Sequence, residues 1–275
     1  MTGQQKLERF YDTLKAHAPA DPGRFSWLLG PDLIRLDDQY LHSSPRVAIV
    51  GQEVHDWYYN YAQFLAGRWE YYYAEPTTKG RVRKAVAEYQ GFDFGFSEKE
   101  PLQGTPFWQF FHEVRKRAFP SEPDAHRKVL WTNLVKFVTK DGSLLKQKMP
   151  YHEVEEVIQL QDDLVTTELR IANPEVCLFV TGPDFDCILR RYFPGLRFEQ
   201  LPLAGARTQL DERKFARLVH RRLPPNSYRT YHPNYLRQRK LWDQVFQILS
   251  QELGAWTNPQ GGADAGPAVQ VTCNP

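Results

Sequence analysis

Polar side chains follow four short apolar runs, at the point where each run ends. These residues are Gly51, Gln52 and Glu53 after the first run, Asn133 after the second, Gly182 and Asp184 after the third, and His232 and Asn234 after the fourth. A side-chain amide offers a donor and an acceptor together, which suits the edge of a nucleobase. An imidazole can donate to an oxygen that gains negative charge, and a carboxylate can position a water and stabilise a cationic sugar. This set of groups favours hydrolysis of an N-glycosidic bond over redox or phosphoryl chemistry.

The apolar runs themselves are typical of buried strands, because they are short and rich in β-branched or aromatic residues. They cover Arg46–Val50, Val129–Thr132, Val176–Thr181 and Tyr228–Tyr231, with a weaker fifth candidate at Leu196–Leu201. Helical periodicity predicts helices over Gln5–His17, Phe107–Phe119, His152–Ile171, Asp211–Leu223 and Tyr235–Leu253. Strands and helices that alternate in this way predict an α/β fold with a parallel sheet. In such folds the site lies beyond the carboxyl ends of the strands.

The 275 residues, 41% hydrophobic and 25% charged, are those of an ordinary globular protein and fit one large domain over residues 1–253. An aromatic-rich insertion is expected at about residues 55–105, and a flexible Gly/Pro-rich tail at 254–275. The aromatic side chains of the insertion could stack on unpaired bases or pack an extra lobe onto the core. They include Trp57, Tyr58, Tyr59, Tyr61, Trp69, Tyr71, Tyr72 and Tyr73.

Several classes of protein are excluded by the sequence. A formal charge of +2 assigns no partner, and three cysteines are too few for a disulfide framework. The N-terminus lacks an apolar signal-peptide core and no apolar run reaches 18 residues, so we expect a soluble, cytoplasmic protein. P-loop, dinucleotide-binding and G-x-S-x-G motifs do not occur. His55 and Asp56 stand beside Glu53, but no other histidine has ligand spacing, so no metal is expected.

Four motifs in this order resemble those of the uracil-DNA glycosylase superfamily. VAIVGQEV is similar to its first motif, VLWTNLVKF to its second strand, and TYHPNYL to its last motif. GTPFWQFF resembles the Gly-x-Pro-Phe element of the thermophile-type branch, where the Phe precedes the Asn by roughly 26 positions, and Phe107 precedes Asn133 by 26 positions. The resemblance covers about residues 45–250. It implies a three-layer α/β/α sandwich around a central four-stranded parallel sheet, and a monomeric, monofunctional DNA-repair hydrolase that flips a damaged base and leaves an abasic site.

The resemblance also implies roles for residues that bind the base. Gly51 and Gln52 would form the pocket floor, with Gln52 contacting the base through its backbone. Phe107 would stack on the flipped base, and Asn133 would read its Watson–Crick edge.

Two residues would be catalytic by the same resemblance. His232 would donate to the base oxygen that becomes anionic, and Glu53 stands where one branch has its water-activating Asp. Glu53 is one methylene longer than Asp, and Val54 replaces the usual Pro, so this chain is a divergent member. The thermophile-type branch carries an iron–sulfur cluster on four cysteines, but only three occur here and none near the expected places. No cofactor is therefore expected.

A basic stretch brackets the last motif. Nine Lys and Arg residues and no Asp or Glu lie between Arg213 and Lys240. Such a stretch could be only a solvated face, but beside the last motif it indicates contact with DNA phosphates. The residues predicted to contact DNA are Arg221, Arg222, Arg229, Asn234 and, as a wedge into the duplex, Leu236.

Two alternatives remain open. The chain could be a catalytically silent nucleic-acid-binding relative, as the changes at Glu53 and Val54 suggest. It could also be a hydrolase of the same fold that acts on another base, or on a free nucleoside or nucleotide.

Overall fold

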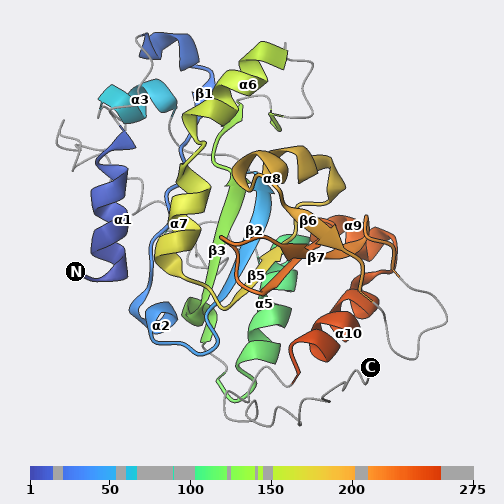
Figure 1. Ribbon diagram of the computed structural model, residues 1–275. Helices are drawn as coiled ribbons and strands as arrows, with labels where there is room; N and C mark the ends of the chain where they lie inside the picture. Colours follow the sequence, from blue (N-terminus) through green and yellow to red (C-terminus); the bar gives the residue numbers. More distant parts are fainter. Residues whose placement is uncertain are drawn as a thin grey trace, which may run out of the picture.

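The computed structural model describes residues 1–14, 21–53, 60–66, 89, 103–122, 125–139, 142–144, 151–201 and 210–254 (Figure 1). Val54, His55, Asp56, the tail from residue 255, and all the named aromatic residues of the insertion except Tyr61 lie outside these residues. Tyr61 is buried, and its ring meets that of Phe137 edge-on at a centroid distance of 5.2 Å. Tyr61 therefore packs onto the core, as Phe64 and Tyr89 of the same insertion do.

The centre of the molecule is a six-stranded mixed sheet in the order β3-β2-β5-β8-β7-β6. The strands β2 (Val47–Glu53), β3 (Val129–Val135), β5 (Val176–Phe179) and β8 (Asn226–Thr230) pair in parallel. The strands β7 (Phe215–Val219) and β6 (Arg197–Glu199) extend the sheet in antiparallel fashion. The α/β class and all five predicted strands are confirmed, and the predicted four parallel strands form part of a larger, mixed sheet of six.

The helix predicted over Asp211–Leu223 is wrong, because this segment contains β7. The backbone of Phe215 pairs with that of Thr230 on one side, and the backbone of Leu218 pairs with that of Phe198 on the other. Apolar residues spaced by three and four positions match a helix, but over a five-residue strand the same residues also satisfy a ladder. Pairing with two neighbouring strands favours the strand over the helix. This pairing is a tertiary effect that cannot be predicted from local spacing.

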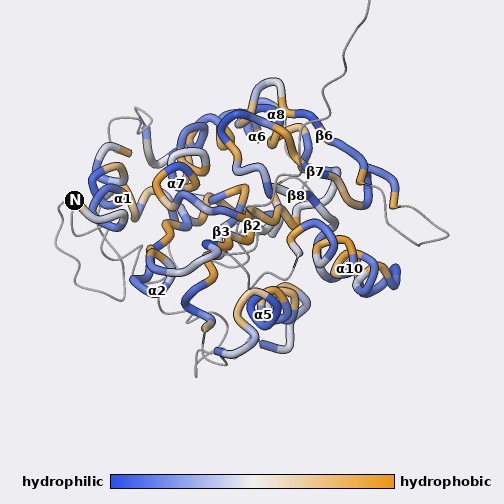
Figure 2. Tube along the Cα trace, turned by 60° about the horizontal axis from the view of Figure 1, so that its bottom comes forward, coloured by the Kyte–Doolittle hydropathy of each residue, from blue (hydrophilic) through white to orange (hydrophobic). Residues whose placement is uncertain are grey.

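Helices cover both faces of the sheet (Figure 2). One face carries α1 (Gly3–Tyr11), α6 (Tyr151–Leu160), α7 (Leu164–Ala172) and α8 (Asp186–Tyr192), and the other carries α5 (Pro106–Ala118) and α10 (Trp242–Glu252). The short helix α9 (Pro233–Gln238) follows β8 directly. Phe110 of α5 packs against Trp242 and Phe246 of α10, with ring centroids 5.5 and 5.0 Å apart.

Two predicted helices are each divided in two. The span His152–Ile171 breaks between Leu160 and Leu164, where the Gln161 side chain turns inward and accepts a hydrogen bond of 2.6 Å from the Lys136 backbone N–H. The span Tyr235–Leu253 breaks at Lys240, whose φ of 55° interrupts the helix between α9 and α10. In both places the apolar spacing continues along the sequence, but the helix is interrupted, once by an inward polar side chain and once by a residue with positive φ.

The remaining elements are short. They are β1 (Leu28–Leu29), β4 (Val138–Thr139), α2 (Asp38–Leu41), α3 (Tyr61–Ala66) and the 3₁₀ turns Pro22–Phe25, Ala125–Lys128 and Pro183–Phe185. Leu28 and Leu29 pair with β4, directly after the end of β3. This pairing brings residues 30–32 to the carboxyl end of the sheet. In the part of the chain that is described, no helix is long and apolar enough to span a membrane.

Candidate functional site at the carboxyl end of the sheet

Three of the predicted base-binding residues meet at one point. Gly51 and Asn133 are partners in the register of β2 and β3. A Cβ atom built on Gly51 would stand 2.4 Å from Asn133 Oδ1 and 3.2 Å from Phe107 Cε2. Phe107 reaches this point because α5 begins at Pro106, which places the aromatic ring in its first turn. An aromatic ring and an amide oxygen therefore adjoin over a glycine backbone that leaves them room.

The Asn133 amide has a partner that the sequence did not suggest. Asn133 is 8% exposed, and its Nδ2 donates a 3.2 Å hydrogen bond to Oδ2 of Asp32, which is fully buried. Asp32 belongs to the segment after β1, and its backbone N–H donates to the Lys136 carbonyl at 2.9 Å. No motif surrounds Asp32 in the sequence, and about a hundred positions separate it from Asn133. Only the pairing of β1 with β4 reveals this contact.

Behind Asn133 lies a buried charge network. The Lys136 ammonium is 2.7 Å from Glu168 Oε2 and 3.8 Å from Asp32 Oδ2, and all three side chains are fully buried. The Tyr11 hydroxyl of α1 donates to Glu168 Oε1 at 2.7 Å. Burial raises the pKa of Asp32 and of Glu168, and the Lys136 ammonium opposes both shifts. One lysine thus serves two carboxyl groups, and it lies closer to Glu168.

Gln52 braces the neighbouring strand end. Its Nε2 donates a 2.7 Å hydrogen bond to the Thr181 carbonyl, just beyond β5. The next residue, Gly182, has a φ of 75°, and its N–H donates to the Thr230 carbonyl of β8 at 2.9 Å. A Cβ there would lie 3.3 Å from the Tyr231 ring. The Gln52 side chain thus holds the end of β5, and the predicted backbone contact of Gln52 with a base stays a prediction.

Glu53, the last residue of β2, is already engaged. Its Oε1 accepts a hydrogen bond from the Ser143 hydroxyl, and its Oε2 accepts one of 2.8 Å from the Leu144 backbone N–H. The carboxylate therefore holds the segment 142–144 against the end of β2.

His232 follows the carboxyl end of β8. Because β3, β2, β5 and β8 are adjacent and parallel, His232 lies at the same end of the sheet as Gly51 and Asn133. It is the N-cap of α9, and its Nδ1 accepts from the Asn234 N–H at 3.3 Å. Because Nδ1 acts as acceptor, the neutral ring carries its proton on Nε2. Asn234 itself is exposed.

Two of the predicted DNA contacts lie inside the protein. Leu236 is fully buried, so in this structure it is a core residue, and the prediction of a wedge is wrong. Arg229 is 1% exposed, with its guanidinium 3.1 Å from the Asp186 carboxylate and its Nη1 donating to the Arg213 carbonyl at 2.7 Å. The prediction that Arg229 contacts DNA is also wrong, because its charge is neutralised within the fold.

Arg221 and Arg222 are exposed but stand at the other end of the sheet. They lie in the turn between β7 and β8, which precedes the first residue of β8, whereas His232 follows its last residue. Arg222 Nη2 donates to the Tyr192 carbonyl at 2.7 Å. Their expected place beside the last motif, where they would contact DNA, is wrong because β7 runs antiparallel to β8 and ends where β8 begins. The exposed cations that do follow His232 are Arg237, Arg239 and Lys240.

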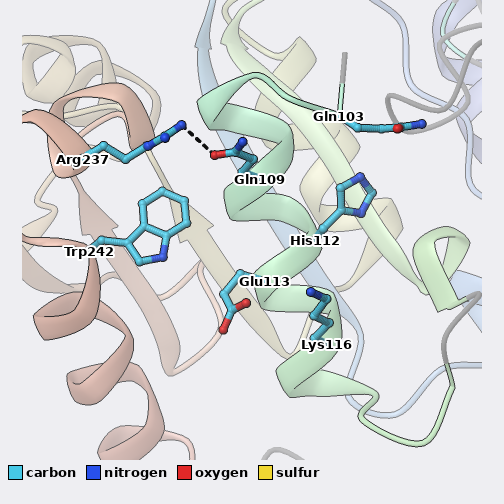
Figure 3. A pocket seen from close by; sticks show the side chains of 7 residues that line it. All are labelled: Gln103, Gln109, His112, Glu113, Lys116, Arg237 and Trp242. Atoms are coloured by element: carbon cyan, nitrogen blue, oxygen red, sulfur yellow. Dashed lines mark hydrogen bonds between the residues drawn. The ribbon is translucent and has the colours of Figure 1, made fainter. Parts of the chain in front are cut away.

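A cavity of about 570 Å³ lies beside this end of the sheet, between α5 and the segment of α9 and α10 (Figure 3). Its lining residues are Gln103, Gln109, His112, Glu113, Lys116, Arg237 and Trp242. Arg237 Nη1 donates to Gln109 Oε1 at 2.7 Å, which joins α9 to α5 two residues after Phe107 (Figure 3). Neither Phe107 nor Asn133 nor His232 lines this cavity. Among the described residues, no group of three or more His, Cys, Asp or Glu side chains could hold a metal ion.

Comparison with known proteins gives no relative to draw on. The scan against protein-family models, the search of curated proteins and the search of solved structures each returned no match. Any assignment of function therefore rests on the residues and their geometry.

Proposed function

We propose that this protein is a DNA glycosylase of the uracil-DNA glycosylase type, which hydrolyses the N-glycosidic bond of uracil or a related base and leaves an abasic site. The observation that carries the proposal is the meeting of Phe107, Asn133 and Gly51 at the carboxyl end of the sheet. A ring to stack on and an amide to read an edge are the two requirements for holding a flipped base. The glycine between them leaves room for the amide beside the ring.

His232 supplies the chemical step in this proposal. As water adds to the sugar C1′ and the C1′–N bond breaks, the electron pair leaves with the base, and negative charge collects on its carbonyl oxygen until the base takes up the proton that the water releases. The Nε2–H of His232 would donate to that oxygen, because its Nδ1 is occupied by the Asn234 N–H. Glu53 would orient the water from the end of β2.

The contacts of Glu53 also favour a second candidate, a catalytically silent nucleic-acid-binding relative. Both of its carboxylate oxygens hold the segment 142–144, so this residue could serve structure alone. A third candidate is a hydrolase of the same type that acts on another base or on a free nucleoside.

Single-turnover base release separates these candidates. Labelled oligonucleotides that carry uracil, hypoxanthine or a G·T mismatch, single- and double-stranded, are compared with the free nucleosides. Release from an oligonucleotide that Asn133→Asp abolishes, but that Asn226→Asp leaves intact, would support the proposal, because Asn226 is exposed at the opposite end of β8. Binding without release would favour the silent relative, and release from nucleosides alone would favour the third candidate.

A further inference from the structure

Asp32 holds the Asn133 amide in one of its two orientations. Asn133 Nδ2 faces the Asp32 carboxylate at 3.2 Å, and Asn133 Oδ1 faces the corner formed by Gly51 and Phe107. A carboxylate oxygen that carries no proton only accepts hydrogen bonds, so Asp32 Oδ2 admits the amide nitrogen and rejects the amide oxygen. We infer that Asp32 is a positioning residue that sets which edge of a base this site accepts. The inference rests on the proposed function and extends it to the class of base.

The position of Asp32 is built into the fold. Its backbone N–H donates to the Lys136 carbonyl at 2.9 Å, three residues beyond Asn133. Gly30, with a φ of 117°, lets the chain approach so closely that a Cβ there would lie 2.7 Å from the same carbonyl. A side chain at residue 30 would push the segment away. The segment that carries Asp32 is therefore clamped onto the end of β3.

The Asp32 carboxylate is poorly satisfied for a purely structural group. Within the described part of the chain, its Oδ1 is buried and has no hydrogen-bond partner, and its Oδ2 has Asn133 and, at 3.8 Å, the Lys136 ammonium. Glu168, by contrast, contacts Lys136 at 2.7 Å and also accepts from Tyr11. An unsatisfied buried carboxylate oxygen costs stability. This cost is explained if the contact with Asn133 is retained for function.

The fixed amide defines a substrate class. Asn133 Oδ1 lies beside Gly51 and close to the Phe107 ring, and with one Nδ2 hydrogen bonded to Asp32 the amide has a second hydrogen to donate. An acceptor and a donor side by side on one amide match a base edge with a ring N–H beside a carbonyl, as in uracil and hypoxanthine. Cytosine presents the reverse pattern, an acceptor beside an amino group. With the amide free to turn over, the site would lose much of this discrimination.

The test compares Asp32→Asn with Glu168→Gln. Both variants replace one buried carboxyl group near Lys136 by an amide. Only Asp32→Asn places an N–H next to Asn133, and this N–H can donate to Asn133 Oδ1 when the Asn133 amide turns over. The measurement is the ratio of affinities for two oligonucleotides with one uncleavable 2′-fluoroarabino nucleotide, uracil in one and cytosine in the other. We expect Asp32→Asn to reduce the uracil preference by about tenfold or more, since one reversed hydrogen-bond pair is lost. Glu168→Gln should leave the ratio within about twofold of the wild type.

A second measurement needs no variant to fold. In ¹⁵N-labelled wild-type protein, one Asn133 side-chain amide proton should exchange slowly with solvent, because it is bound to a buried carboxylate. Fast exchange of both protons, or an unchanged base preference in folded Asp32→Asn, would overturn the inference. If the wild type binds neither oligonucleotide and releases no base, the proposed function fails, and the exchange measurement still decides whether Asp32 holds Asn133.

Discussion

A Cβ atom on Gly51 would lie 2.4 Å from the amide oxygen of Asn133, its partner in register on the adjacent strand. Gly51→Ala therefore cannot fit unless Asn133 moves, and Asp32 restrains that movement. We expect single-turnover base release to fall by about 10²-fold, as for a displacement of about 1 Å at a reacting site. Gly104→Ala is the matched control, because a Cβ there has no heavy atom within 4 Å. Equal activity of the two variants would show that the amide position does not matter.

His232 has two functions that substitution can separate. Its Nδ1 caps α9, and its Nε2–H is the proposed donor to the departing base. His232→Asn keeps a capping acceptor but does not extend as far as Nε2, whereas His232→Leu removes both. We expect both variants to release base about 10²–10³-fold more slowly, with oligonucleotide affinity changed only a few-fold. Only His232→Leu should also lower the free energy of unfolding, by about 1 kcal/mol.

Glu53 can be tested against the serine that it holds. Glu53→Gln keeps an acceptor for the Leu144 N–H but loses the charge that would activate water. If Glu53 is catalytic, base release should fall by about 10²-fold or more. Ser143→Ala removes the contact to Oε1 and should leave release within a few-fold. Similar rates in Glu53→Gln and the wild type would assign Glu53 to holding the segment 142–144.

From the structure we expect phosphate contacts at Arg237 of α9 and at Arg239, which caps the end of this helix. Arg237 and Arg239 are exposed after His232, whereas Arg221 and Arg222 lie at the opposite end of the sheet. Replacing Arg237 and Arg239 together by Ala should reduce the slope of log K against log salt by about 1.8, or about 0.9 for each lost phosphate contact. The matched control, Arg221→Ala with Arg222→Ala, should leave the slope unchanged. A larger effect of the control would place the DNA at the other end of the sheet.

His112 should make stability depend on pH. Burial lowers its pKa to about 4, below the usual 6.5, so the folded protein resists protonation of this ring. Between pH 6.5 and 4 the unfolded chain binds a proton that the folded chain does not, and the free energy of unfolding falls as the pH is lowered through this window. The full shift corresponds to roughly 3 kcal/mol, and solvent screening at this partly exposed side chain reduces it to about 2 kcal/mol. His112→Gln should lose less stability in denaturant titrations between pH 7 and 4.5, and an identical loss would contradict the assignment.

Local sequence was enough to predict the strands that carry the site. The runs before Gly51, Asn133 and His232 are short and rich in β-branched or aromatic residues, and each forms a parallel strand at the predicted place. Because side chains that follow parallel strands share one end of the sheet, their common location also followed from the sequence. The roles of these residues stay predictions.

What the sequence could not predict depends on long-range pairing. Asp32 reaches Asn133 only because β1 pairs with β4, and the segment Asp211–Leu223 becomes a strand only because two neighbours accept its backbone. The charge run through Arg229 indicated a surface, but Asp186 neutralises Arg229 inside the fold. Charge and apolar spacing describe a segment by itself, whereas these three outcomes are decided by partners far along the chain.

The register between β2 and β3 joins residues roughly 80 positions apart, and it fixes Gly51 against Asn133 through strand hydrogen bonds alone. Loop-closure entropy grows only slowly with length, by about 0.6 kcal/mol for each doubling. Lengthening or shortening the chain between Glu53 and Gly104 would therefore cost the β2–β3 ladder little, whereas a slip of one residue would turn Asn133 to the opposite face. Insertions between Glu53 and Gly104 should therefore leave the pairing of Gly51 with Asn133 unchanged. That stretch of chain can change in length while the corner of Gly51, Asn133 and Phe107 keeps its shape, as long as Tyr61 keeps its place against Phe137.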